Sequence, residues 1–100
     1  MKVYLDDERK TPDGWVRVFW PKEAIELLKT GNVKEISLDH DLGDDDLGTG
    51  YDVVLWIEEA VYMNNFKPPK IKVHSANTSA RHKMELGIQS IKRKYATTIL

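Results

Sequence analysis

Two acidic pairs in this sequence contain the oxygen ligands that a hard divalent cation prefers. Asp6 and Asp7 follow one short apolar run, and Asp39 and Asp41 follow another. Mg²⁺ takes carboxylate oxygens together with water and a substrate phosphate rather than a closed protein cage. We therefore predict a divalent metal site, with Mg²⁺ as the first choice, held by these four aspartates. The alternative is that each aspartate is a solvated loop residue or a helix cap.

Two histidines accompany the acidic pairs and could transfer protons. His40 lies between Asp39 and Asp41, and His74 follows a further apolar run. Imidazole titrates near neutral pH, so the two rings could act as general acid and base on a phosphoester, with Asp39 as a third catalytic group. The alternative for each of these histidines is a hydrogen-bonded structural role. We expect the remaining histidine, His82, to lie on the surface.

Three further residues could bind a phosphate group. The planar guanidinium of Arg9 suits phosphate oxygens, although an ion pair with Glu8 or Asp13 would explain it equally well. Ser75 and Asn77 could donate hydrogen bonds to the same oxygens, and helix capping is their alternative role. The sequence thus predicts a substrate-binding set of Arg9, Ser75 and Asn77.

The polar clusters are expected to meet because each one follows a predicted strand. Short runs rich in apolar and β-branched residues predict strands over 3–5, 15–20, 35–38 and 70–73. One-sided or nearly continuous apolar patterns predict helices over 21–30, over 51–64 and from about 78 onward, the last capped by Thr78 or Ser79. This alternation of strands and helices indicates a parallel sheet, in which ligands bind at the carboxyl edge of the strands.

We predict an α/β fold of the receiver-like, or flavodoxin-like, type. The expected architecture is a three-layer sandwich around a mainly parallel sheet of four to five strands in the order 2-1-3-4, with residues 97–100 as an optional fifth strand. Residues 8–14 are too few to hold a helix after the first strand, so that helix is missing. The second strand could run parallel over an extended loop or antiparallel in a hairpin. Residues 1–100 are expected to form a single domain.

The composition limits the classes of function. The sequence has no cysteine, which excludes disulfides and thiolate metal sites. It has no run of about 18 apolar residues and no signal-peptide pattern at its start, so we predict a cytoplasmic protein without a membrane partner. The net charge of −1 argues against DNA binding driven by overall charge, and it leaves the oligomeric state open. The expected ligand is a small phosphoester or nucleotide, or an RNA end.

The order of the motifs resembles the receiver-like domains called cyclic-phosphate processing receivers. The segments that carry the resemblance are Leu5-Asp6-Asp7-Glu8-Arg9, Ile36-Ser37-Leu38-Asp39-His40-Asp41-Leu42-Gly43 and Val73-His74-Ser75-Ala76-Asn77, and it covers essentially the whole chain. It implies a receiver-like fold that acts on a cyclic phosphate. The first-strand acids, Asp39 and Ser75 also match the Mg²⁺ ligands, the phosphoacceptor and the hydroxyl of response-regulator receivers. No lysine follows a fifth strand here, which departs from that wider pattern.

Three functions follow from these observations. The first is a metal-dependent cyclic phosphodiesterase or phosphohydrolase that opens the cyclic phosphate of a nucleotide or RNA end. The second is a signalling module phosphorylated on Asp39. The third is a module that binds a nucleotide or a protein without turnover.

Overall fold

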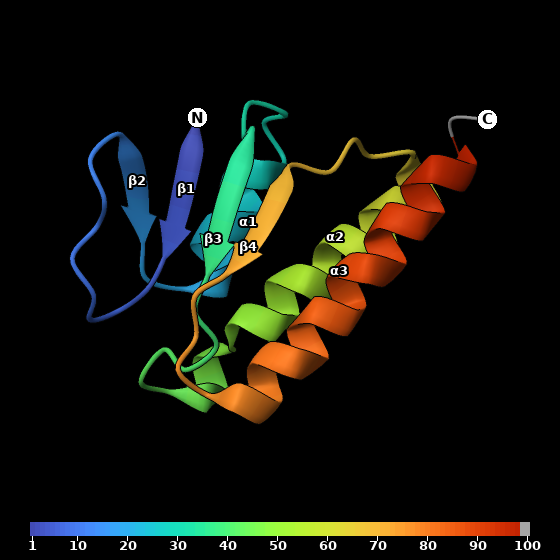
Figure 1. The fold of residues 1–100 in the computed structure, drawn as a ribbon. Helices are drawn as coiled ribbons and strands as arrows, with labels where there is room; N and C mark the ends of the chain where they lie inside the picture. The colour runs from blue at the N-terminus through green and yellow to red at the C-terminus, as the bar shows by residue number, and fades with distance from the viewer. Residues whose placement is uncertain (99–100) are drawn as a thin grey trace.

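The computed structural model describes residues 1–98 and shows a four-stranded parallel sheet with three α-helices (Figure 1). The sheet has the order β2-β1-β3-β4, which confirms the predicted order and the receiver-like α/β class. The strands are β1 (Lys2–Leu5), β2 (Trp15–Val18), β3 (Glu35–Leu38) and β4 (Lys70–Val73). The helices are α1 (Pro21–Leu28), α2 (Gly50–Asn64) and α3 (Thr78–Thr98), with a 3₁₀ turn, η1 (Asp45–Leu47), before α2.

β1 and β2 are parallel although no helix connects them. Their register pairs Lys2 with Trp15 and Leu5 with Val18. Residues 6–14 make the return, and the backbone N–H of Asp6 donates to the carbonyl of Val18 at 3.2 Å. The missing helix is therefore confirmed, and the antiparallel hairpin that the sequence left open is excluded.

β2 ends two residues before the predicted boundary because the next helix begins there. The Glu23 carboxylate accepts hydrogen bonds from the backbone N–H groups of Phe19 and Trp20, both at 3.1 Å. Pro21 then occupies the first position of α1, where its missing N–H costs nothing. The aromatic residues at 19 and 20 thus belong to the start of α1 rather than to the strand.

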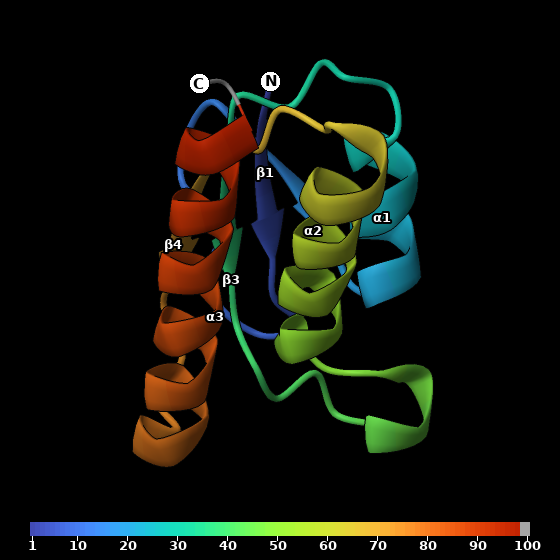
Figure 2. The same cartoon turned by 90° about the vertical axis from the view of Figure 1, so that its right-hand side faces the viewer.

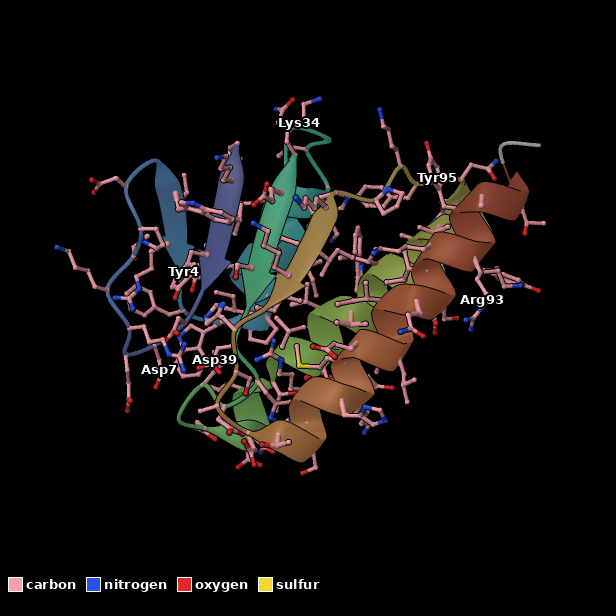
Figure 3. The ribbon with its side chains drawn as sticks, in the orientation of Figure 1. Tyr4, Asp7, Lys34, Asp39, Arg93 and Tyr95 are labelled. Atoms are coloured by element: carbon pink, nitrogen blue, oxygen red, sulfur yellow. The ribbon has the colours of Figure 1, made fainter. Side chains whose placement is uncertain are left out.

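All three helices lie on one face of the sheet (Figures 1 and 2). That face presents Val3, Leu5, Ile36 and Leu38, each 0% exposed, to a single core shared with the helices. The other face, which we call the open face, bears no helix among the described residues. Strand alternation places eight side chains on it: Lys2, Tyr4, Trp15, Arg17, Glu35, Ser37, Lys70 and Lys72. Figure 3 labels Tyr4 on β1, and below it in the view Asp7 and Asp39 at the carboxyl edge.

The one-sided packing corrects the expected three-layer sandwich to two layers. A helix after β1 would have to cross to the open face to make the third layer, and residues 6–14 contain none. The optional fifth strand is also corrected in part, since residues 97 and 98 continue α3. Residues 99 and 100 lie outside the described residues.

α3 begins one residue earlier than the predicted caps imply. The side-chain oxygen of Asn77 accepts the backbone N–H of Ala80 at 3.1 Å, so Asn77 is the cap rather than Thr78 or Ser79. None of the helices in the described part of the chain is both long enough and apolar enough to span a lipid bilayer.

Candidate metal and phosphoester site

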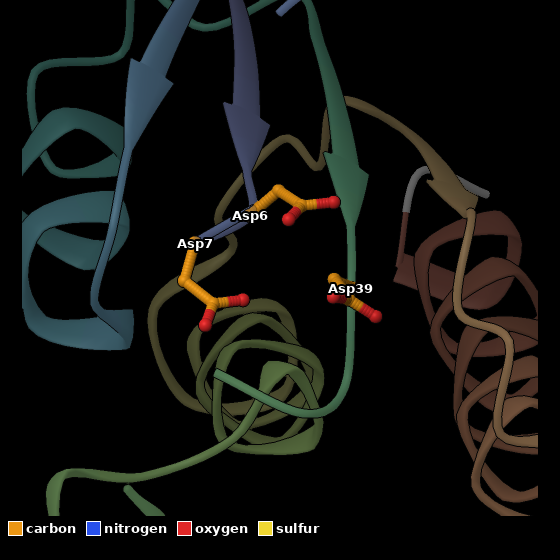
Figure 4. A group of neighbouring side chains, drawn as sticks. All are labelled: Asp6, Asp7 and Asp39. Atoms are coloured by element: carbon orange, nitrogen blue, oxygen red, sulfur yellow. The ribbon is translucent and has the colours of Figure 1, made fainter. Parts of the chain in front are cut away.

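Three aspartates converge at the carboxyl edge of the two central strands (Figure 4). Asp6 and Asp7 directly follow β1, and Asp39 directly follows the neighbouring parallel strand β3. One carboxylate oxygen from each residue lies within 4.8 Å of the others. They line an open cavity of about 320 Å³ whose wall also contains Glu8, Arg9, Asp41, Gly43 and Ala76.

Asp6 is the fixed point of this cluster. Its side chain is buried, one oxygen accepts the backbone N–H groups of Glu8 at 2.8 Å and Arg9 at 3.0 Å, and the other meets His74 Nε2 at 3.0 Å. Burial by itself raises the pKa of the Asp6 carboxyl, but the backbone hydrogen bonds and His74 together outweigh it and hold this pKa below its ordinary value. Asp6 therefore carries an ionised and well-oriented carboxylate.

Asp39 has the opposite electrostatic environment. Burial raises the pKa of its carboxyl first, and the negative charge of Asp6 raises it further. Hydrogen bonds from the His40 backbone N–H, at 2.8 Å, and from the Ser75 hydroxyl offset only part of this effect. The ionised Asp6 thus lies beside Asp39, whose carboxyl resists ionisation. A cation bound between the two would stabilise the ionised form of both.

His74 lies on the open face, behind Asp6. Its ring stacks on Tyr4, with centroids 4.3 Å apart and planes within 2°, and its Nδ1 lies 2.7 Å from the Ser37 hydroxyl oxygen. The small side chain of Ser37, on the strand between them, lets the imidazole reach across β3 to Asp6 on β1. Burial lowers the pKa of His74, and Asp6 offsets part of that shift.

These contacts define the tautomer of the neutral ring. An ionised Asp6 can only accept, so His74 Nε2 carries the proton and donates it to the Asp6 carboxylate. His74 Nδ1 then accepts from the Ser37 hydroxyl. Both ring nitrogens of His74 are thus bound by the protein.

The second histidine belongs to a chain of contacts beside the cavity. His40 Nδ1 lies 2.8 Å from one Asp41 carboxylate oxygen, and the Asn77 amide donates to the other at 3.4 Å. The hydrogen bond with His40 is the main cause that lowers the pKa of Asp41. His40 keeps 21% of its side chain exposed, so its ring remains accessible to solvent.

The structure places the predicted site residues in two shells. Around the cavity lie Arg9 and the four aspartates Asp6, Asp7, Asp39 and Asp41. Neither histidine lines the cavity, and neither does Ser75 or Asn77. Ser75 supports Asp39 from behind, while Arg9 extends its Nε to 3.9 Å from an Asp6 oxygen with half of its side chain exposed.

A comparison with known protein families assigns the chain to one of them. The sequence model of the cyclic-phosphate processing Receiver domain matches residues 1–90. The chain belongs to this family. Searches of curated proteins and of solved structures found no match.

Sequence reasoning overlooked three residues on which the site of this cyclic-phosphate processing receiver domain depends. Gly50 donates its N–H to the His40 carbonyl at 3.1 Å, and a Cβ at this position would lie 1.8 Å from the Asp39 carbonyl oxygen. Tyr4 and Ser37 hold the His74 ring. Of the three, only Ser37 could have been recognised in the sequence, because it places a hydroxyl inside an apolar strand. The contact of Gly50 with Asp39 exists only in the folded chain, so the sequence does not indicate it.

The partly buried His74 of this receiver domain should make folding stability fall in mild acid. Its pKa is lowered in the folded state, so below about pH 6.5 the unfolded chain binds a proton that the folded chain does not. Urea unfolding should therefore show a lower midpoint at about pH 5.5 than at about pH 7.5. Asp39 acts in the opposite direction, because its raised pKa makes the folded state bind the extra proton.

The control for this pH effect is a comparison of two histidine variants. His74→Gln should remove most of the pH dependence, whereas His82→Gln, on the exposed surface of α3, should keep it. An unfolding midpoint that responds to pH in the same way in His74→Gln as in wild type would contradict a neutral, partly buried His74.

Proposed function

We propose that this domain hydrolyses a cyclic phosphoester at the carboxyl edge of the sheet with the help of a divalent metal ion. The observation that carries the proposal is the convergence of Asp6, Asp7 and Asp39 on an open cavity that also contains Arg9. The family assignment supplies the substrate class, a cyclic phosphate. The charges of the cavity suit a phosphate only when a cation offsets the carboxylates.

The donor set fits a hard divalent cation such as Mg²⁺. Asp6, Asp7 and Asp39 would hold the ion through carboxylate oxygens, and Asp41 would add a further oxygen from the cavity wall. The pKa of Asp39, which burial raises first and the charge of Asp6 raises further, supports the same conclusion. When bound, the metal supplies Lewis acidity toward the phosphate oxygens.

We assign proton transfer to His40. Its Nδ1 is oriented by the Asp41 carboxylate, which leaves Nε2 for the substrate. In the reaction a water oxygen bonds to phosphorus, one ring P–O bond breaks, and the departing ribose oxygen takes the proton from His40 while the water proton passes to solvent. Asp39 contributes as a member of the carboxylate cluster.

His74 acts through Asp6 in this proposal. Asp6 and Ser37 bind both ring nitrogens of His74, so this ring does not reach the substrate. It orients the Asp6 carboxylate and helps to keep it ionised. Ser75 and Asn77 play comparable supporting roles, Ser75 toward Asp39 and Asn77 toward Asp41. Arg9 is the residue that we assign to the phosphate, since its half-exposed guanidinium lies at the cavity wall.

A product assay tests this function directly. The full chain is incubated with nucleoside 2′,3′- and 3′,5′-cyclic monophosphates, with and without Mg²⁺ or Mn²⁺, and the products are followed by chromatography and phosphorus NMR. We expect metal-dependent ring opening that falls at least 100-fold in His40→Ala, the loss typical of a removed general acid. His82→Ala should keep full activity. Chemical-shift changes without any product would reject hydrolysis and leave a binding module.

The contact between Asp39 and Ser75 favours one second function, phosphorylation of Asp39. A carboxylate at the end of β3 beside a hydroxyl that follows β4 matches the arrangement that receivers use for a phosphoacceptor. Among the residues that line the cavity, the only cation is Arg9 and none is lysine. A stable acyl phosphate after treatment with acetyl phosphate and Mg²⁺, absent in Asp39→Asn, would establish this function instead.

A further inference from the structure

The open face of the sheet is basic although the whole chain carries a net charge of −1. Its four cations are Lys2, Arg17, Lys70 and Lys72, against the single anion Glu35. Lys72 Nζ lies 3.0 Å from a Glu35 oxygen, and this contact, with the charges of Lys70 and Lys2, lowers the pKa of Glu35. The three lysines therefore gather around one carboxylate and leave a surplus of positive charge.

Aromatic rings connect this basic surface to the candidate site. The His74 ring, hydrogen-bonded to Asp6, stacks on Tyr4, and Tyr4 meets Trp15 edge-to-face at 6.1 Å. Trp15 is half-buried, and Lys2 Nζ lies 5.6 Å from its ring centroid. Tyr4 itself is buried under the His74 ring, so Trp15 is the ring of this group that is available to a base. Basic side chains beside a partly exposed aromatic ring are the two components that bind single-stranded nucleic acid without sequence preference.

We propose that the open face binds single-stranded RNA, with its terminal cyclic phosphate in the aspartate cavity. This proposal rests on the proposed function for one point, the cyclic phosphate bound in the cavity. A 2′,3′-cyclic phosphate requires a ribose 2′-hydroxyl, so the nucleic acid is RNA. From Asp6 back to Lys2 the strand covers about 13 Å at ~3.3 Å per residue, so the nucleotides before the end lie over Trp15 and the lysines. Charge complementarity favours RNA over a second copy of the chain, whose same face is equally basic.

Binding is measured by fluorescence anisotropy with the full chain and a labelled octaribonucleotide that ends in a 2′,3′-cyclic phosphate. Trp15→Ala should weaken binding roughly 10-fold through the loss of one stacked base, and Trp15→Phe should restore most of it. Lys70→Glu should weaken binding and flatten its salt dependence. Lys22→Glu is the matched control. Lys22 is also exposed, but it lies on α1, which packs on the opposite face of the sheet from the proposed RNA surface.

Two comparisons separate this inference from the proposed function. An RNA with a plain 3′-hydroxyl that binds in a Trp15-dependent way, while no cyclic phosphate is opened, would support the RNA surface and reject the hydrolysis. Nucleoside cyclic monophosphates turned over with the same kcat/KM as the oligomer would support the hydrolysis and overturn the RNA surface. Equal affinity of wild type, Trp15→Ala and Lys70→Glu for the RNA would overturn it as well. So would an acidic peptide that displaces the RNA at equal concentration.

Discussion

Replacing Gly50 by alanine is expected to destabilise the domain by at least about 3 kcal/mol and to abolish metal binding. The added Cβ would lie 1.8 Å from the Asp39 carbonyl oxygen and 3.0 Å from the Met84 methyl group. Since the nearest neighbour is backbone, relief requires a shift of the α2 N-terminus or of the segment that carries Asp39. Urea unfolding and Mg²⁺ titration by calorimetry measure the two effects.

The control for Gly50→Ala is Gly14→Ala. Gly14 has a φ of +84° and nothing within 4 Å of an added Cβ, so its substitution costs only the left-handed backbone conformation, about 1 kcal/mol. Mg²⁺ binding should be unchanged in this variant. If Gly50→Ala were no less stable than Gly14→Ala, the close approach of α2 to Asp39 would be wrong.

Asp39→Asn is expected to stabilise the metal-free protein and to remove its response to Mg²⁺. The raised pKa of Asp39 means that its ionised form opposes folding at neutral pH, so a neutral amide should raise the Tm of the EDTA-treated protein by a few degrees. In wild type, Mg²⁺ at about 100 times its Kd should add about 2.7 kcal/mol. The variant should not gain this stability, because its amide side chain lacks the carboxylate that the ion requires.

Differential scanning calorimetry with and without Mg²⁺ measures both changes. Asp45→Asn provides a matched loss of one carboxylate on the exposed turn η1, outside the cluster, and should keep the full response to Mg²⁺. A wild-type Tm that does not respond to millimolar Mg²⁺ would remove the metal from the proposed function. An Asp39→Asn protein that still responds as wild type does would place the ion elsewhere.

The sheet order and the convergence of the aspartates could be predicted because both depend on local pattern. Each strand is a short apolar run, and parallel topology brings the residues that follow β1 and β3 to one edge. The direction of β2 could not be predicted, because residues 6–14 have the length for either return. The two-layer packing could not be predicted. The sequence shows that the helix after β1 is absent, but it does not show that the three remaining helices all pack on the same face of the sheet.

The histidines show where residue type alone stops being informative. His40 and His74 have the same side chain and both lie just after a strand, yet among the described residues the protein binds both ring nitrogens of His74 and only Nδ1 of His40. The difference arises from Ser37 on β3 and Tyr4 on β1, which are distant in sequence from His74 and meet it only through sheet pairing. A role for an imidazole therefore depends on its neighbours on adjacent strands, which a single sequence does not reveal.

The purely parallel topology also directs the electric field of the domain. Because every helix follows the carboxyl end of a strand, α1, α2 and α3 all begin near the edge that carries Asp6 and Asp39 (Figure 1). Each helix N-terminus carries a partial positive charge of roughly half an elementary charge. Three aligned macrodipoles thus offset part of the carboxylate charge at this edge. The backbone itself therefore lowers the electrostatic repulsion between the acidic cavity and a phosphate.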